Sequence, residues 1–265
     1  MSETFQVPNL VRGLKIIEFL VTQESPQTIT EIANAMELPK NSVMRIIHAL
    51  EHYDYVNREA ESKRYRITRK LFSMAYRMPH EKTLIESSRD AMRIIRDEFK
   101  ETVVLTVIEG ARGIILEQVQ GLHPFRFVCE PGVQQSLHSS ASTKAILAFM
   151  PEQAQQAMLE RIDYTPYTEN TLSSRSALSK ELVQIRRQGY ALDRAEQIEG
   201  VHCVAAAIQD HTGAPVAALT TTGPSSRIDL QQDAAHIGNF IRTQTLAVSR
   251  ELGYVPENRL TALPA

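Results

Sequence analysis

The chain has 265 residues, 43% of them hydrophobic and 23% charged, with a formal net charge of −2, which fits an ordinary globular protein of one or two domains. No run reaches the ~18–20 apolar residues of a membrane span, and the start "MSETFQVPNL" is not a signal peptide. The two cysteines, Cys129 and Cys203, lack CxxC spacing, so a reduced, cytoplasmic protein without membrane association is predicted.

Charge is unevenly distributed along the chain. Residues 1–80 contain 11 Lys and Arg against 9 Asp and Glu, whereas the remainder contains 18 against 22. The segment "KRYRITRK", residues 63–70, has five basic residues in eight. A weakly basic N-terminal part and an acidic C-terminal part are compatible with DNA binding by the N-terminal part only.

Three short helices are predicted at the start, in residues 9–21, 28–38 and 39–54. Either Thr28 or Thr30 is expected to cap the second helix, and Pro39 stands where the third begins. The expected inward stripes are Val11, Leu14, Ile17 and Val21; Ile29, Ile32, Ala33 and Met36; and Val43, Ile46, Ile47 and Leu50.

Two short strands around a charged turn, Tyr55–Arg58 and Arg64–Thr68, are predicted to follow. Helix, helix–turn–helix and hairpin is the order of a winged helix-turn-helix domain, which we place at residues 7–69. A linker helix is expected over residues 70–82.

The rest of the chain predicts an α+β domain with a mostly antiparallel sheet, over residues 83–258. A long opening helix is expected to precede three β-rich runs and three helices. A hairpin and a closing helix near Asp229–Leu252 complete it. The β-rich runs are residues 102–110, 112–120 and 124–132, the helices 140–150, 151–162 and 174–189, and the hairpin lies within 190–223.

The outer face of the third helix has the side chains of a major-groove reader. Arg45 matches the guanine edge, and Asn41 could read adenine. Phosphate contacts suit Lys40, Ser42 and His48. The remaining DNA-contacting candidates are Met44 on this face and Lys63 and Arg64 in the wing. Taken alone, the face reads better as a solvated helix surface, but the full order of elements favours a double-stranded DNA reader.

Several segments resemble the IclR family of bacterial transcription regulators. "RGLKIIEFL", "LPKNSVMRIIHALEHYDYV" and "RYRIT" resemble its DNA-binding domain. "LHSSASTKAILAFM", "RRQGYALDRAEQIEGVHCVAAAI" and "GAPVAALTTTGPSSRI" resemble its effector domain. The resemblance implies an effector-responsive regulator with a GAF-like C-terminal domain, forming dimers or tetramers, and leaves repression and activation both open. A palindromic operator is then expected.

The predicted hairpin places polar groups on one sheet face. If Asp210 faces Gly213 across a tight turn in "DHTG", then Cys203 opposes Thr220 and Val201 opposes Thr222. Side chains alternate along a strand, so these four share a face. A register slip by one residue would break this pairing.

A helix start supplies a second feature of the same pocket. In "HSSASTKAIL", the N–H groups of Ala141, Ser142 and Thr143 are expected to be unpaired at the positive end of the helix dipole. Such an end binds anions, so a small carboxylate effector is predicted.

The family resemblance implies effector contacts at the same places. The residues at those positions are Ala141, Ser142, Asp193, Val201, Cys203, Thr220 and Thr222, with Phe127 as a looser candidate from the preceding strand. The chain departs from the family in "SASTK", where a glycine-rich version is common, and has threonines in its last strand where serines are frequent.

Plainer interpretations exist for each of these residues. A lone cysteine in an apolar run is usually core, threonine favours strands, and Asp193 could cap a turn. The competing functional class is an enzyme with Cys203 as nucleophile. His202 would point to the opposite face of the strand, leaving only a distant histidine such as His138 as base. No GxSxG, P-loop, GxGxxG or metal-ligand spacing occurs in the sequence, so neither cofactor nor metal is expected.

Overall fold

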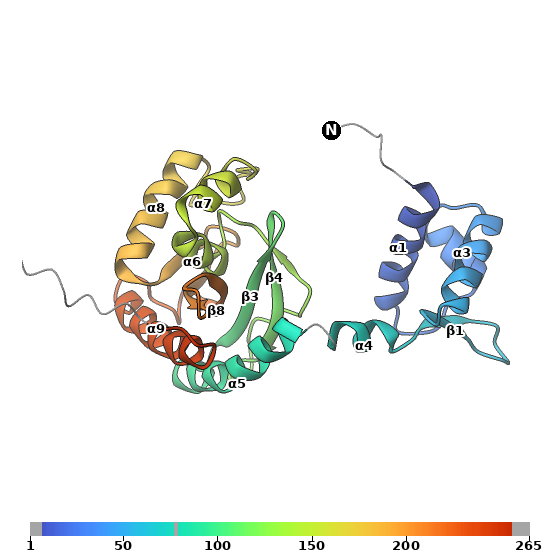
Figure 1. The fold of residues 1–265 in the computed structure, drawn as a ribbon, viewed down its shortest axis with the longest axis horizontal. Helices are drawn as coiled ribbons and strands as arrows, with labels where there is room; N and C mark the ends of the chain where they lie inside the picture. The colour runs from blue at the N-terminus through green and yellow to red at the C-terminus, as the bar shows by residue number, and fades with distance from the viewer. Residues whose placement is uncertain (1–6, 77–78, 256–265) are drawn as a thin grey trace, which may run out of the picture. The chain divides into compact units, whose positions relative to one another are not determined.

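The structure is a computed structural model that describes residues 7–76 and 79–255. It divides into two compact units between residues 79 and 80, and each unit is described by itself. Figure 1 shows the order of the elements along the chain. The expected linker over 70–82 includes residues 77–78, which lie outside the described residues, as do residues 256–258 of the expected second domain.

The first unit has the winged helix-turn-helix order that the sequence predicts. Its two strands pair antiparallel, with Asn57 opposite Arg66. The elements are α1 (Pro8–Val21), α2 (Ile29–Ala35), α3 (Lys40–His52), β1 (Val56–Arg58), β2 (Tyr65–Ile67) and α4 (Lys70–Tyr76). Both strands are shorter than expected.

The predicted inward face of α1 is wrong by one position. Gly13, Ile16 and Leu20 are the buried residues, whereas Leu14 and Val21 are more than half exposed. The helix has apolar residues on both stripes, so periodicity alone could not choose between them. The packing of Ile16 and Leu20 in the core of the first unit selects the inward face, since even a Cβ at Gly13 would lie 3.6 Å from Ile46 of α3, an ordinary contact distance.

The starts of α2 and α3 follow from their sequence. Of the two expected caps, Thr28 is the one observed: its hydroxyl accepts from the Glu31 N–H at 3.2 Å, and the Glu31 carboxylate accepts from the Thr28 N–H at 2.7 Å. This reciprocal capping box fixes where α2 begins. On α3 the predicted stripe packs inward, with Val43 and Ile47 fully buried.

The second unit is a mixed α+β domain built on one antiparallel sheet, as predicted. The six strands lie in the order β5-β4-β3-β8-β7-β6, and each pairs antiparallel with its neighbours. The strands are β3 (Thr102–Glu109), β4 (Arg112–Val119), β5 (Gln134–Gln135), β6 (Ala191–Arg194), β7 (Val201–Gln209) and β8 (Pro215–Pro224). The helices are α5 (Pro79–Phe99), α6 (Ala141–Phe149), α7 (Glu152–Leu159), α8 (Arg175–Gln188) and α9 (Ala234–Glu251).

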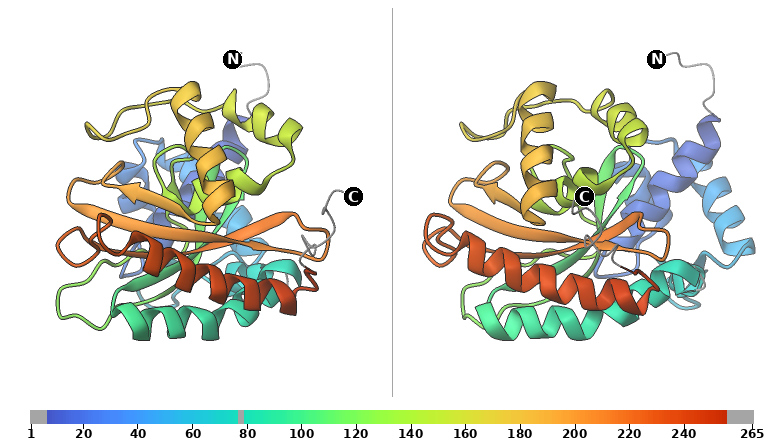
Figure 2. Two further views of the ribbon diagram at one scale, coloured as in Figure 1. Left: turned by 90° about the vertical axis from the view of Figure 1, so that its left-hand side faces the viewer. Right: turned by 60° about the vertical axis from the view of Figure 1, so that its left-hand side comes forward.

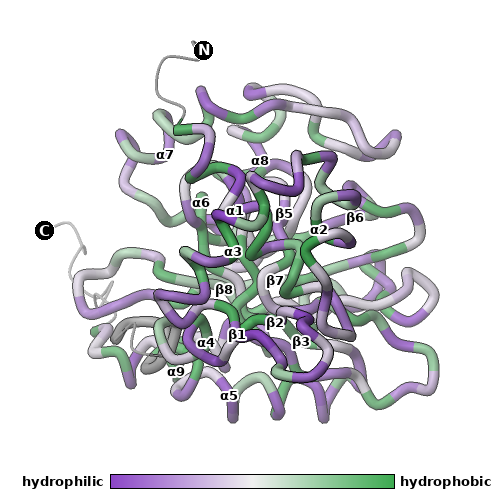
Figure 3. The backbone as a smooth tube through the Cα atoms, turned by 90° about the vertical axis from the view of Figure 1, so that its right-hand side faces the viewer, coloured by the Kyte–Doolittle hydropathy of each residue, from purple (hydrophilic) through white to green (hydrophobic). Residues whose placement is uncertain are grey.

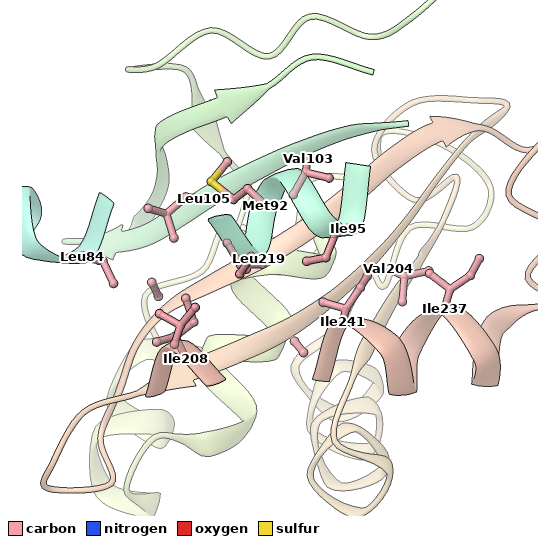
Figure 4. Close-up of a cluster of buried hydrophobic side chains, with 14 of the residues drawn as sticks. Leu84, Met92, Ile95, Val103, Leu105, Val204, Ile208, Leu219, Ile237 and Ile241 are labelled. Atoms are coloured by element: carbon pink, nitrogen blue, oxygen red, sulfur yellow. The ribbon is translucent and has the colours of Figure 1, made fainter. Parts of the chain in front are cut away.

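Helices cover both faces of this sheet. Helices α5 and α9 run side by side beneath one face, and α6, α7 and α8 lie over the other (Figure 2). Figure 4 shows the core on the α5/α9 side, where Met92 and Ile95 of α5 and Ile241 of α9 meet Leu105 and Leu219 of the sheet. Hydrophilic and hydrophobic residues alternate along the outer helices (Figure 3), as expected of elements with one buried face.

The expected β-rich run at 124–132 is not a strand. Residues 121–133 form a loop, which is held by a few backbone hydrogen bonds near its ends and by side chains between them, without a strand ladder. Thr102 Oγ1 donates to the Phe127 carbonyl at 2.6 Å, and the Cys129 N–H donates to Gln118 Oε1 at 3.0 Å. Pro124 lacks the N–H that a ladder requires. Phe127 is therefore a loop residue, not the strand residue that we expected.

The hairpin register also differs from the prediction. Cys203 lies opposite Thr222, Ala205 opposite Thr220, and Val201 opposite Pro224. The cause is a longer turn, closed by the Asp210 N–H donating to the Ala214 carbonyl at 3.0 Å, with an irregularity at Ile208–Gln209. Because the slip is by two residues, the shared face of the four predicted side chains is retained.

Candidate functional site

The outer face of α3 presents the predicted DNA-contacting residues to solvent. Arg45, Asn41 and Lys40 are exposed, as are Met44 and His48 on the same face, and Ser42 is half-buried. The buried residues Val43 and Ile47 hold the opposite side of the helix against α1 and α2. The structure thus brings these six together on one helix, the shape and chemistry of a major-groove element.

The two wing residues differ from each other. Lys63 is exposed at the tip of the β1–β2 hairpin, in a left-handed backbone conformation with φ of 55°. The Arg64 guanidinium instead donates to both carboxylate oxygens of Glu31, at 2.9 and 3.1 Å, and to the Pro26 carbonyl at 2.9 Å. Arg64 therefore ties the wing to the start of α2, a role that sequence reasoning missed.

An apolar groove of about 910 Å³ runs between α1, α3 and α4. Asn41, Ser42 and Arg45 line one wall, and Leu10 and Leu14 of α1 line another. Both leucines are more than half exposed. The groove therefore lies next to the outer face of α3.

In the second unit, the start of α6 is buried against the sheet. Ala141 and Ser142 are fully buried, and among the described residues no hydrogen bond to the N–H groups of Ala141, Ser142 or Thr143 is found. Ser140 stands at the N-cap position without a capping hydrogen bond. Three unpaired donors at the positive end of a helix favour an anion there.

The close approach of α6 to the sheet has a specific cause. A Cβ on Gly113 of β4 would lie 2.4 Å from the Thr143 methyl carbon, so only glycine leaves room for the helix start. The Thr143 hydroxyl is within donating distance of the Ser136 carbonyl at 2.9 Å. The Ser142 hydroxyl donates to Gln135 Oε1 at 2.7 Å, so this hydroxyl is already engaged by the protein.

A row of four polar side chains crosses the face of the sheet that α6 covers. The register places Thr102 opposite Thr222, Thr222 opposite Cys203, and Cys203 opposite Asp193. The Cys203 thiol lies 3.2 Å from Thr222 Oγ1. Three of the predicted effector residues thus form one continuous row, which we call the polar row.

Thr220 and Val201 lie on the same face as the polar row, and Phe127 is held near it. The Thr220 hydroxyl is buried and has no hydrogen-bond partner among the described residues. Val201 is buried next to the end of β8. Phe127 is half-buried, and its carbonyl accepts from Thr102 at the end of the row.

A buried ion pair beside the polar row was missed by sequence reasoning. Lys144 Nζ contacts both carboxylate oxygens of Glu196 at 2.5 and 2.6 Å, and both residues are nearly inaccessible. The available signal was the lysine that directly precedes the apolar run "AILAF", on a helix whose residues 141–148 are all buried. Burial raises the pKa of Glu196, while the Lys144 ammonium opposes that shift.

Asp193 is held by this pair. Its Oδ1 accepts from the Glu196 N–H at 2.7 Å, and Ala195 between them adopts a left-handed φ of 59°. Burial raises the pKa of Asp193 to about 7, against the opposing charge of Lys144. Asp193 therefore caps the turn after β6, the plainer of its two expected roles, and is also the last member of the polar row.

Cys203 and His138 do not form a nucleophile and base. Burial raises the pKa of Cys203 well above that of a free thiol, which makes it a poor nucleophile. The two ring nitrogens of His138 are engaged by the Ser136 hydroxyl at 3.1 Å and the Thr165 carbonyl at 3.0 Å. Among the described residues no group of three His, Cys, Asp or Glu side chains could hold a metal ion, and no helix is long and apolar enough to cross a membrane.

Two family models match the chain. Residues 9–60 match the IclR helix-turn-helix domain, and residues 77–250 match the model described as bacterial transcriptional regulator IclR C-terminal. The second match alone spans more than half of the sequence.

Individual proteins are similar over most of their length. The transcriptional repressor IclR of Escherichia coli (strain K12) is 31% identical over 227 residues, which cover 85% of this chain and 83% of that protein. The Thermotoga maritima IclR structure has a TM-score of 0.79 at 28% identity and covers 94% of this chain and 100% of its own. An IclR homolog from Microbacterium hydrocarbonoxydans, complexed with 4-hydroxybenzoate, has the same fold, with a TM-score of 0.77 at 19% identity and coverage of 92% and 98%.

Proposed function

The chain belongs to the IclR family of bacterial transcription regulators, and we propose that it binds a palindromic operator through α3 and a small carboxylate at the start of α6. It is a regulator with a DNA-binding domain and an effector domain, not an enzyme. Two observations support the effector proposal: the N–H groups at the start of α6 and the buried Thr220 hydroxyl on the sheet face that α6 covers, all without a hydrogen-bond partner among the described residues. Acting on bacterial DNA, it would work in the cytoplasm.

For DNA, we assign base reading to Arg45 and Asn41, and phosphate contacts to Lys40, Ser42, His48 and Lys63. Met44 would contact bases by its apolar side chain. All of these side chains except the half-buried Ser42 are exposed, which supports the assignment. Arg64 is proposed to orient the wing through Glu31 instead of contacting the backbone of DNA directly.

Arg45→Ala should weaken binding of the natural operator by about 1–3 kcal/mol and leave binding of random DNA nearly unchanged, because the arginine fork reads a base edge. Lys63→Ala, a matched loss of one exposed cation, should weaken both DNAs alike and lower the salt dependence. Fluorescence anisotropy over a salt series measures both. Normal operator binding by Arg45→Ala would remove Arg45 from the readout.

We further propose self-association, as a dimer or tetramer. One winged helix contacts few base pairs, so two copies on a two-fold symmetric site are needed for specificity. The exposed leucines Leu10 and Leu14 beside the apolar groove of the first unit supply a surface suited to a second copy.

A fragment of residues 79–258, which keeps α5 whole, should fold alone and bind a carboxylate without binding the operator. It contains the complete sheet and both helical layers. A thermal-shift panel of acetate, benzoate, 4-hydroxybenzoate and gluconate tests it, since a ligand at 100 times its dissociation constant adds about 2.7 kcal/mol to stability. Operator binding by the fragment would overturn the domain assignment, and a panel without any shift would count against a carboxylate of these types.

A further inference from the structure

The buried groups beside the polar row do not balance in charge. Lys144 supplies one cation, whereas Glu196 and Asp193 supply two carboxyl groups, and all three side chains are buried. Both strong contacts of Lys144 go to Glu196, which leaves Asp193 without a direct cation. A second buried carboxylate without its own partner is costly, and such a group keeps its proton instead.

The other groups that face Asp193 do not change this balance. Cys203 on β7 is a neutral thiol, because burial raises its pKa well above that of a free thiol. Arg194 is directed to Glu181 of α8 at 3.0 Å and reaches Glu196 only at 3.9 Å. The pKa of Asp193, raised by burial to about 7, agrees with the geometry.

Building on the carboxylate site proposed above, we propose that Asp193 serves that site as a neutral carboxylic acid, so that the effector anion is taken up only with a proton held at Asp193. An anion at the start of α6 adds a second negative charge near Glu196, which favours the protonated acid further. Effector affinity then falls as pH rises through neutrality, and the response of the regulator to its effector becomes pH-dependent.

The polar row shows how the protonation state of Asp193 would affect the hydrogen bond that Thr222 offers to the ligand. Asp193 Oδ1 accepts from the Glu196 N–H, so the proton would be carried by the other oxygen, and Asp193 lies opposite Cys203 in the sheet. The Cys203 thiol in turn donates to the Thr222 hydroxyl at 3.2 Å. A protonated Asp193 leaves Thr222 free to donate to an anion, whereas a charged Asp193 attracts the thiol proton and reverses the row.

Asp193→Asn is the decisive variant, because the amide keeps an acceptor for the Glu196 N–H and mimics the protonated acid. Asp90→Asn, at an exposed carboxylate on α5, is the matched control. The probes are the four panel acids, which are fully ionised from pH 6 to pH 8. If only the protein with a protonated Asp193 binds the effector, the wild-type affinity for a panel acid that binds should fall about tenfold between pH 6 and pH 8.

Asp193→Asn should bind that acid equally at both pH values, and Asp90→Asn should behave as wild type. A wild-type affinity that is the same at pH 6 and pH 8, or a variant as pH-dependent as wild type, would overturn the proposal. So would the absence of binding by every acid at pH 6, which would at the same time count against a carboxylate effector of these types.

A measurement without ligand distinguishes a failure of the Asp193 proposal from a failure of the carboxylate site. The native pKa of Asp193 lies above its unfolded value, so the native state holds a proton that the unfolded chain has lost. The urea midpoint of the full chain should therefore decrease from pH 5 to pH 7 and level off above, more steeply in wild type than in Asp193→Asn. Equal profiles would show that Asp193 is not a neutral acid, whatever the panel shows.

Discussion

Lys144→Met is expected to cost about 3–5 kcal/mol of stability, because it leaves the buried Glu196 carboxylate with no cation closer than the Arg194 guanidinium at 3.9 Å. Both partners are almost completely inaccessible, so neither can regain hydration without a local rearrangement. The methionine side chain matches the length of the lysine stem and preserves packing. Urea denaturation of the full chain, monitored by circular dichroism, measures the loss in the unfolding transition of the second unit.

Three comparisons isolate the cause of that loss. Lys180→Met removes an exposed lysine of α8 and should change stability by less than about 0.5 kcal/mol. Lys144→Met combined with Glu196→Leu should recover part of the loss, since no unpaired charge remains. The single variant should also be less destabilised at pH 5 than at pH 8, because Glu196 then folds protonated. A Lys144→Met midpoint equal to that of Lys180→Met would show that the pair is not held as described.

This ion pair also connects stability to the site. The Glu196 N–H positions Asp193, and Thr171 Oγ1 and Thr168 Oγ1 donate to the Glu196 and Ala195 carbonyls at 2.6 and 2.7 Å. The segment that follows β6 is therefore fixed from several sides. Loss of Lys144 should loosen Asp193 as well as lower the free energy of unfolding.

Much of the fold was predictable, because local patterns decide it. The capping box of Thr28, the stripe on α3 and the left-handed Gly189 that ends α8 each act over a few residues. The family resemblance supplied the rest of the outline. What failed depended on contacts between distant segments. The face of α1 was set by the packing of Ile16 and Leu20 into the core of the first unit, and residues 124–132 became a loop held by Thr102 and Gln118.

The candidate site shows the same division. Strand alternation predicted the shared face of Cys203, Thr220 and Thr222, even though the turn length and therefore the register were wrong. No local pattern pairs Lys144 with Glu196, which are 52 residues apart in sequence. Nor does spacing reveal that Arg64 turns back to Glu31 instead of outward. Long polar side chains choose partners in three dimensions, so their roles required the structure.

Thr220→Val is expected to act with opposite signs on stability and on effector binding. The Thr220 hydroxyl is buried without a partner among the described residues, so the isosteric valine removes an unmet hydrogen-bonding group and should stabilise the free protein by about 1–3 kcal/mol. If the hydroxyl meets the effector beside the start of α6, the same change should weaken effector binding by about 1–3 kcal/mol.

Thr221→Val is the matched control for Thr220→Val. Its hydroxyl is also buried and unpartnered within the described residues, but Thr221 pairs with Val103 and Val204 and faces the α5/α9 core on the other side of the sheet. It should stabilise the protein by a similar amount and leave effector affinity unchanged. Urea denaturation gives the first quantity, and calorimetry with the tightest panel acid gives the second. Equal losses of affinity in both variants would mean that the sheet responds as a whole and that Thr220 makes no contact of its own.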